Sequence, residues 1–142
     1  MAEYRYCISL RITHPIVDPK EITREIGLEP HVSWKVGDPR ISPKGTSIGG
    51  IRKESYWTAH PHTEKRLHSK NMHLEEYIEK LTSDLKTHKE YFAEIRSGGG
   101  NIEYFIGLFG AGNIGNVFVS DLLSEIGGLG IDLSFDIYAG EE

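Results

Sequence analysis

Residues 4–13 constrain the fold more than any other segment of the chain. Their side chains alternate between apolar and more polar types without interruption, which is the period-two pattern of a β-strand with two unlike faces. The apolar face is formed by Tyr4, Tyr6, Ile8, Leu10 and Ile12. Such a strand must cover its apolar face with another layer, so we expect helices on one side of a sheet and a more polar surface on the other.

A helix is predicted directly after this strand. Asp18 suits the N-cap, Pro19 the first helical position, and Glu21 lies three residues after the cap. Gly27 is a natural end for a helix that runs to Ile26. Further strands are predicted at 32–36, 52–59, 102–109 and 131–138, further helices at 72–95 and 116–126, and a long loop at 38–50.

This order of elements predicts an α+β fold with residues 1–142 as a single domain. We expect a single mixed β-sheet of about five strands, with helices mainly on one face and a ferredoxin-like arrangement. The segments REIGL (24–28) and SEIGG (124–128) end two predicted helices in a similar way. The chain is therefore compatible with duplicated βαβ units, whose first and third helices would pack equivalently on the sheet.

The apolar side chains of residues 72–95 recur at steps of four and three. This heptad spacing allows a seam between two copies of the chain. It also fits an amphipathic helix, broken near Ser83 or Thr87, that lies on the sheet. We favour the second interpretation, because His88 interrupts the apolar row and the run is short for a coiled coil.

Composition restricts the class of protein. The formal net charge is −5 at pH 7, so no overall attraction to nucleic acid or to an anionic membrane is expected. No segment reaches the ~18 apolar residues of a membrane-spanning helix, and the N-terminus lacks a signal-peptide pattern. The single cysteine, Cys7, excludes an internal disulfide. We expect a cytoplasmic protein with neither nucleic acid nor membrane as a partner.

A complete G-x-G-x-x-G lies at 110–115, between a predicted strand and a predicted helix. The candidate ligand-binding residues here are Gly110, Gly112, Gly115 and Asn116. In a dinucleotide-binding fold such glycines bring backbone N–H groups and a helix N-terminus to a pyrophosphate, and Asp136 would contact a ribose hydroxyl. Too few strand–helix units surround the motif, and glycine is frequent nearby. We favour a plain turn, with a small anion at the helix N-terminus as the intermediate interpretation.

The predicted loop at 38–50 and its flanks hold the clearest local excess of positive charge. The candidate contact residues are Lys35, Arg40, Lys44 and Arg52. Such a cluster can bind a phosphate or the acidic surface of a partner, and a long irregular segment is often functional. A solvated, mobile loop is the plainer interpretation.

Five of the seven histidines lie between His60 and His88. Zinc needs three or four converging ligands, and this region has no H-E-x-x-H and no cysteine. We therefore predict a histidine-rich surface connector with some pH sensitivity, and no metal.

The polar face of the sheet is a further candidate surface. If the first and last strands are neighbours, Arg5 and Arg11 can pair with Asp132 and Asp136 across them. No catalytic constellation is recognised in the sequence, so no catalytic residue and no cofactor is assigned.

Motifs along nearly the whole chain identify a known family. They are Ile8 to Thr13 (ISLRIT), Asp18-Pro19-x-x-Ile22, Ile26-Gly27-Leu28-x-Pro30, Lys35-x-Gly37, the strand with Trp57, and Leu133-x-x-Asp136-Ile137-Tyr138. With these features the chain resembles an uncharacterised bacterial family of proteins, domain-of-unknown-function family 4279. The resemblance implies a small stand-alone domain and brings no settled activity.

The function expected from the sequence is that of a non-enzymatic protein-binding module, with an inhibitor of the bacterial immunity type as one form of it. The alternative is a small-ligand or nucleotide-binding sensor that uses the glycine-rich turn at 110–115. The oligomeric state is left open between monomer and homodimer.

Overall fold

The computed structural model describes residues 2–140, and its centre is one mixed sheet with the strand order β2-β5-β1-β7-β8. These strands are β1 (Arg5–His14), β2 (Val32–Trp34), β5 (Ser55–Ala59), β7 (Asn101–Gly110) and β8 (Ile131–Ala139). The short β6 (Leu67–His68) pairs with the start of β1. β1 is antiparallel to both β5 and β7, whereas β8 is parallel to β7. The predicted α+β class with a mixed sheet of about five strands is confirmed.

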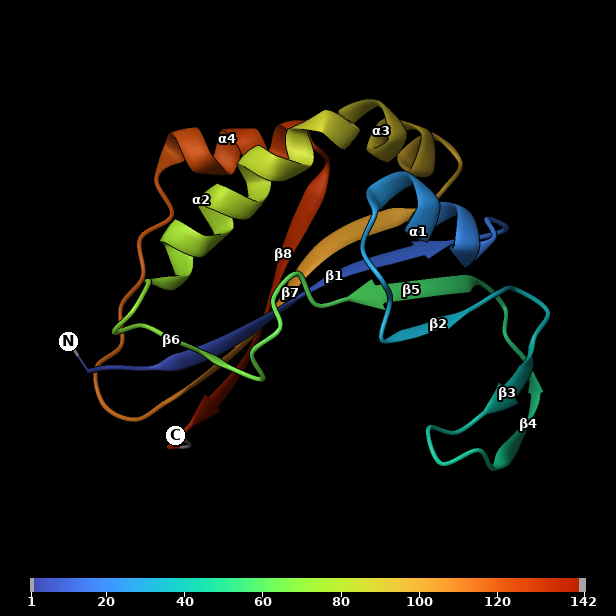
Figure 1. Ribbon diagram of the computed structural model, residues 1–142, viewed down its shortest axis with the longest axis horizontal. Coiled ribbons are helices and arrows are strands. Elements are labelled where there is room, and N and C mark those ends of the chain that lie inside the picture. Colours follow the sequence, from blue (N-terminus) through green and yellow to red (C-terminus); the bar gives the residue numbers. More distant parts are fainter. Residues whose placement is uncertain (1, 141–142) are drawn as a thin grey trace.

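The helices lie together on one side of this sheet (Figure 1). They are α1 (Pro19–Ile26), α2 (Leu74–Leu85), the 3₁₀ turn η1 (Lys86–His88), α3 (Lys89–Ser97) and α4 (Ser120–Gly128). The order β1-α1-β2-β5, then α2 and α3, then β7 is the βαββαβ order of ferredoxin-like folds. No helix within residues 2–140 is long and apolar enough to cross a membrane.

The two proposed strand–helix–strand units differ in one respect. β7, α4 and β8 form a unit whose two parallel strands are direct neighbours. β1, α1 and β2 form a unit whose strands are separated by β5. The first and last strands are not neighbours either, because β7 lies between β1 and β8.

The residues that cap α1 at both ends explain why its bounds could be predicted from the local sequence. The Lys20 N–H donates to Asp18 Oδ1 at 3.0 Å, so Asp18 caps the helix as expected. Gly27 ends the helix with a left-handed φ of 81°, and its N–H donates to the Thr23 carbonyl.

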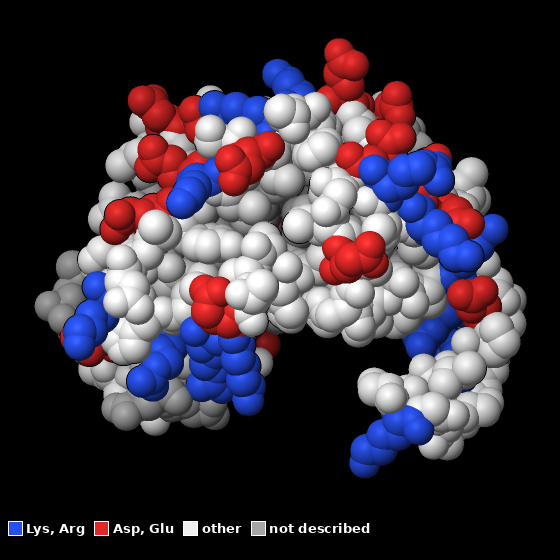
Figure 2. Space-filling view, in the orientation of Figure 1, with Lys and Arg blue, Asp and Glu red and all other residues white. Residues whose placement is uncertain are grey.

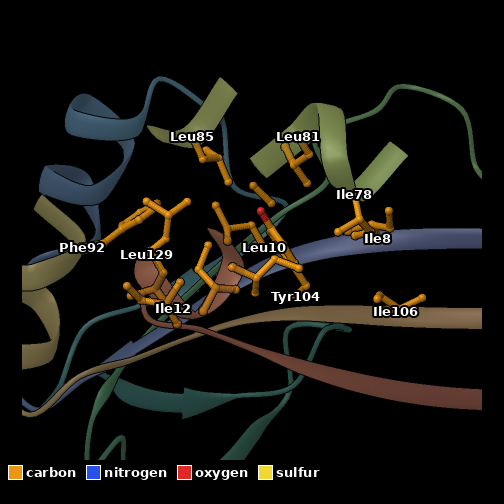
Figure 3. Packing of buried hydrophobic residues seen from close by; sticks show 14 of the residues in the cluster. Ile8, Leu10, Ile12, Ile78, Leu81, Leu85, Phe92, Tyr104, Ile106 and Leu129 are labelled. Atoms are coloured by element: carbon orange, nitrogen blue, oxygen red, sulfur yellow. The ribbon is translucent and has the colours of Figure 1, made fainter. Parts of the chain in front are cut away.

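The core fills the space between the sheet and the helices (Figure 3). All five apolar residues of the β1 alternation are buried. The helical side contributes Ile78, Leu81, Leu85 and Phe92, which point toward β1 and β7. The apolar side chains of the heptad-like row in 72–95 are therefore buried in the core of their own chain. The predicted break in the helix occurs at η1, which contains Thr87. This confirms the amphipathic-helix interpretation over the two-copy seam.

The predicted loop at 38–50 is wrong in part, because it contains a β-hairpin. β3 (Pro39–Ile41) and β4 (Ser47–Ile51) form a separate two-stranded sheet. Ser42 and Thr46 exchange hydrogen bonds across the turn, and Gly45 supplies a φ of +85°. Of the prolines and glycines that suggested a loop, Pro43 and Gly45 lie in the turn, whereas Pro39, Gly49 and Gly50 lie within β3 and β4.

The helix predicted at 116–126 is also displaced, since α4 begins only at Ser120. The Val117 N–H donates to Glu75 Oε2 at 2.9 Å, outside any helical hydrogen bond. Val117, Phe118 and Val119 are aromatic or β-branched, which lowers helix propensity. The chain therefore reaches α4 through an irregular segment from 111 to 119.

Two predicted strands are shorter than expected, and β6 was not predicted. The segment 32–36 is a strand only to Trp34, because the Val36 N–H donates to Ser55 Oγ instead of to the ladder. The segment 52–59 is a strand only from Ser55.

Candidate functional site

No helix covers the face of the sheet that points away from the helices, and we call it the open face; its side chains are half-buried or buried on β1, β5 and β7 and mostly exposed on β8. It is defined by Arg5, Cys7, Ser9 and Arg11 of β1 and by the side chains in register with them on β5, β7 and β8. The β3–β4 hairpin extends past the sheet on this same side (Figure 1). Figure 2 shows the molecule hollowed beneath the sheet, with Lys and Arg side chains on both sides of the hollow.

Three arginines lie over aromatic rings on or beside the open face. The guanidinium carbon of Arg11 is 3.7 Å from the ring centroid of Phe105, and that of Arg66 is 3.6 Å from Phe109. Arg52 lies over Trp34 at 3.7 Å. Stacked guanidinium groups keep their in-plane N–H groups available for carboxylates or phosphates.

Two of the rings beneath these arginines, Trp34 and Phe109, are themselves supported by other rings. Trp34 stacks on Tyr56 with centroids 4.6 Å apart. Phe109 stacks on Tyr138 at 4.7 Å with the planes 5° apart. Arg52 and Arg66 are therefore held on stacked pairs of rings, whereas Arg11 lies on a single ring.

Arg11 lies at the centre of the open face. Its Nη1 donates to Glu103 Oε1 of β7 at 3.3 Å. Its Nε and the hydroxyl of Thr58, directly opposite on β5, are buried and lack a hydrogen-bond partner among the described residues. Buried polar atoms without partners are uncommon in native proteins, so these two atoms set this position apart within the sheet.

The ion pairs predicted across the first and last strands do not form in that way. Because β7 separates β1 from β8, Arg11 pairs with Glu103 and not with Asp132, which lies one strand further along the same row. Asp136 accepts the Tyr138 hydroxyl at 2.9 Å. The two aspartates make the β8 side of the open face acidic, whereas the β1 and β2 side is basic.

Histidines line the border of the open face next to β5. The rings of His31 and His60 stack with centroids 4.0 Å apart, and His60 Nδ1 lies 3.2 Å from both Ser9 Oγ and the Ile8 carbonyl. Burial, together with the nearby His60 and Arg11, lowers the pKa of His31. Burial also lowers the pKa of His62. Among residues 2–140 no group of three or more His, Cys, Asp or Glu side chains could hold a metal ion.

Cys7 lies in this face but is not activated. Burial raises the pKa of its thiol. A Cβ added to Gly107, its partner on β7, would come within 3.0 Å of the Cys7 sulfur. The cysteine therefore acts as a small packing residue.

The four candidate residues of the basic segment are distributed around the hairpin. Arg52 is the one that connects hairpin and sheet, because its Nη2 donates to the Ile41 carbonyl at 3.2 Å while its plane covers Trp34. Arg40 lies on β3 and Lys44 in the turn, both exposed. Lys35 is also exposed, and its backbone N–H donates to Asp38 Oδ2 at 2.9 Å.

The hairpin also presents apolar side chains to solvent. Ile41, Ile48 and Ile51 are 49%, 48% and 60% exposed. Every residue of β3 and β4 is exposed, so no part of the chain described here buries this hairpin. Isolated two-stranded hairpins are only marginally stable, and exposed apolar patches mark interaction surfaces.

The glycine-rich turn has a different role from that of a dinucleotide motif. Gly110 is the last residue of β7, and α4 begins five residues after Gly115, so the glycines do not lie at a helix N-terminus. Gly112 supplies a turn with a φ of +84°. Figure 1 shows the segment rising from the end of β7 past the sheet before it reaches α4.

Asn116 ties this segment to the core. Its Nδ2 donates to the Tyr4 hydroxyl at 2.7 Å and to Glu75 Oε1 at 3.0 Å. Burial alone would raise the pKa of Glu75, but hydrogen bonds from its own N–H, from the Val117 N–H and from Asn116 outweigh it and lower that pKa. Asn116 thus uses its amide on protein groups rather than presenting it to a ligand.

Sequence reasoning missed most of the arginine–aromatic pairs. Arg66, Phe109 and Tyr56 were not singled out, and Arg52 was named only as part of the basic segment, without Trp34 as its partner. A signal was nonetheless present, because Phe105 and Phe109 occupy positions of the polar face in a strand whose other face is apolar. Aromatic residues at such positions mark a surface that is not simply solvated.

Comparison with known families places the chain in one of them. The family described as "Domain of unknown function (DUF4279)" matches residues 2–140, nearly the whole chain. The protein belongs to this family. No curated protein and no solved structure matches the chain significantly.

Proposed function

We propose that this protein is a non-enzymatic, cytoplasmic binding module that holds an acidic segment of another protein on its open face. The observation that carries this proposal is the set of three arginines stacked on aromatic rings, Arg11 on Phe105, Arg52 on Trp34 and Arg66 on Phe109. Tryptophan, tyrosine and arginine dominate the energetically important positions of protein interfaces.

The charge distribution supports a partner with carboxylates. The chain is acidic overall, yet the β1 and β2 side of the open face and the hairpin carry the arginines described above. The guanidinium groups of Arg11 and Arg52 are charged donors whose hydrogen bonds a carboxylate could accept, although the Nε of each is buried. Charge complementarity of this kind sets specificity and association rate.

The exposed isoleucines of the hairpin favour a partner that carries apolar side chains as well as carboxylates. Ile41 and Ile51 flank the basic residues of the hairpin and are exposed. A segment with alternating carboxylate and aliphatic side chains could contact both the arginines and these isoleucines. Burial of exposed aliphatic side chains would supply most of the affinity, at about 25 cal/mol per Å² of apolar surface.

A protein partner fits this surface better than a nucleic acid. Single-stranded nucleic acids are bound by stacking bases on open aromatic rings. Here Phe105 and Phe109 are covered by arginines, and Asp132 and Asp136 would repel phosphates from the β8 side.

Selection from a phage-displayed random peptide library on the immobilised full chain tests the proposal. We expect enrichment of Asp and Glu next to Leu, Ile or Phe. A synthetic peptide of the selected sequence should bind in calorimetry, and Arg11→Gln or Arg52→Gln should weaken binding at least tenfold. Lys20→Gln, on the exposed surface of α1, is the matched control and should leave affinity unchanged. Binding that survives both arginine variants, or tight binding of poly(U) RNA by the wild type, would overturn the proposal.

The sensor alternative rests on one observation. A cavity of about 300 Å³ lies beside the glycine-rich turn and is lined in part by Arg5, His68 and Gly110. Native mass spectrometry with NAD or ATP tests it, because a nucleotide adduct that Gly112→Leu abolishes would favour this alternative over the open face. A chain that takes up neither nucleotide would remove the support for it.

A further inference from the structure

We propose that β8 pairs with β8 of a second copy of this chain, antiparallel and centred on Phe135, to form a homodimer with one continuous sheet. β8 is hydrogen-bonded to β7 along all of its residues, whereas no strand of residues 2–140 covers its other edge. The opposite edge of the sheet, β2, has only three residues. β8 is therefore the long free edge of this fold.

The backbone groups of this edge can be assigned residue by residue. The Gly140 N–H donates to the Gly110 carbonyl at 2.8 Å, so the even-numbered residues of β8 direct their backbone groups toward β7. The odd-numbered residues, Ile131 to Ala139, then direct their N–H and C=O groups outward. A row of unpaired backbone groups is a template for another strand.

β8 has two charged side chains, Asp132 and Asp136, both on the open face, but it lacks other usual protections of an edge strand. It contains neither proline nor lysine, and it runs for nine residues. Phe135 and Ile137 are 41% and 66% exposed. Phe135 contacts Phe118 with ring centroids 6.0 Å apart, and the flanking Val117 and Val119 are exposed as well. The helix side of this edge is thus an exposed apolar border.

The sequence of β8 is complementary to itself in one register. Two-fold pairing centred on Phe135 uses all nine residues, with each Leu133 opposite the Ile137 of the other copy. On the open face, Ser134 then lies opposite Asp136, and Asp132 opposite Tyr138. Centring the pair on Ser134 or Asp136 would place aspartates directly opposite each other, which is unfavourable.

We therefore expect a second copy of the chain to bind this edge. The arrangement is isologous, as in most homodimers, because the same strand of each copy forms the interface. A two-fold axis perpendicular to the sheet keeps the helices of both copies on one side. The two open faces then lie on the other side of a single sheet. This inference does not depend on what the open face binds, but it would make that binding bivalent.

Sedimentation equilibrium of the wild-type chain tests the dimer, and we expect twice the mass of one chain at micromolar concentration. Ile137→Lys places a charge on the edge without removing a core side chain, and it should weaken dimerisation at least tenfold while the circular dichroism spectrum is retained. Ile16→Lys is the matched control, because Ile16 is 73% exposed and distant from β8 in the fold, and it should leave the dimer intact. A monomeric wild type, or a dimer that Ile137→Lys does not weaken, would overturn the proposal.

Cysteine pairs test the register. In a Cys7→Ser background, Ser134→Cys and Asp136→Cys chains should form a mixed disulfide when combined under oxidation, because these positions face each other across the two-fold axis. Each variant alone should cross-link much less, since its own position is offset by two residues in the partner. Equal cross-linking alone and in the mixture, or none in either, would contradict this register.

Discussion

His62 Nε2 accepts the backbone N–H of Ile8 at 3.0 Å. At this point β5 has ended, because its pairing with β1 stops at Leu10, and β6 pairs only with Arg5 and Tyr6. His62 Nδ1 lies 2.8 Å from the Glu64 carbonyl, so a neutral ring protonated at Nδ1 satisfies both bonds. The His62 side chain thus accepts the hydrogen bond that a neighbouring strand would accept, at the point of β1 between the ends of β5 and β6.

This geometry predicts a loss of stability in mild acid. Burial lowers the pKa of His62 below 6.5, so the unfolded chain binds the proton more readily than the folded one. The contribution of His62 is complete above pH 6.5 and decreases as the pH falls toward the lower folded pKa, by at most about 1.4 kcal/mol per pH unit. His31, whose pKa is also lowered, acts in the same direction, while His60, Tyr77 and Glu64 are the titratable groups beside His62.

Urea unfolding at pH 7.5 and 5.5 measures this effect. The free energy of unfolding should fall between these two pH values in the wild type and should fall less in His62→Gln. An identical pH dependence in both proteins would show that His62 does not bear the proton linkage.

The hydrogen bond between Thr82 and Tyr104 predicts that the effects of substituting these two core residues on stability are not additive. The two hydroxyl oxygens are 2.9 Å apart and buried, and burial raises the pKa of Tyr104 to about 12. Thr82→Val leaves the Tyr104 hydroxyl without a partner and should cost about 1–3 kcal/mol. The double variant with Tyr104→Phe should cost less than the sum of the two single variants. Strict additivity in chemical denaturation would contradict the coupling.

Two glycines should respond to alanine in opposite directions. A Cβ at Gly110 would lie 2.6 Å from Ile114 Cδ1 and 3.2 Å from Tyr4 Cβ, so Gly110→Ala should destabilise the fold. Gly127 lies within α4, and a Cβ there meets no atom within 4 Å. Gly127→Ala should therefore stabilise by about 0.5–1 kcal/mol, because alanine has the higher helix propensity. Thermal melting compares the two, and equal effects would be inconsistent with this packing.

Arg52 should determine how firmly the hairpin is held. Arg52→Gln removes both the stacking on Trp34 and much of the bond to the Ile41 carbonyl. Hydrogen exchange of the amides in β3 and β4 should then become several-fold faster. Arg40→Gln, on the exposed β3, is the matched control and should change exchange little. If both variants behave alike, Arg52 is not the connection between hairpin and sheet.

The elements that are determined by residues close to one another in the sequence were predictable from the sequence. The strand at 4–13 and the helix capped by Asp18 follow from local periodicity and capping. The irregular segment before α4 was not predictable, because it is held by Glu75 on α2, a residue remote in sequence. The hairpin was not predicted, because prolines and glycines, which indicate loops, occur both in its turn and in its strands β3 and β4.

The candidate site was predictable only in outline. The polar face of the sheet and the basic segment with Arg52 were both recognised as possible surfaces. Their combination was not, because the Arg11–Phe105 and Arg52–Trp34 pairs join different strands or segments. Such pairs depend on strand order and register, and a single sequence does not specify which strands are neighbours.

The most direct test of the open face as a protein-binding surface is an NMR titration of the ¹⁵N-labelled chain with an acidic peptide selected on it. We expect the shifts to concentrate on amides of β1, β5 and the β3–β4 hairpin and on the Nε–H groups of Arg11 and Arg52, while α1 to α4 stay unchanged. Shifts confined to the helices or to residues 110–116 would contradict it and move the binding site away from the open face.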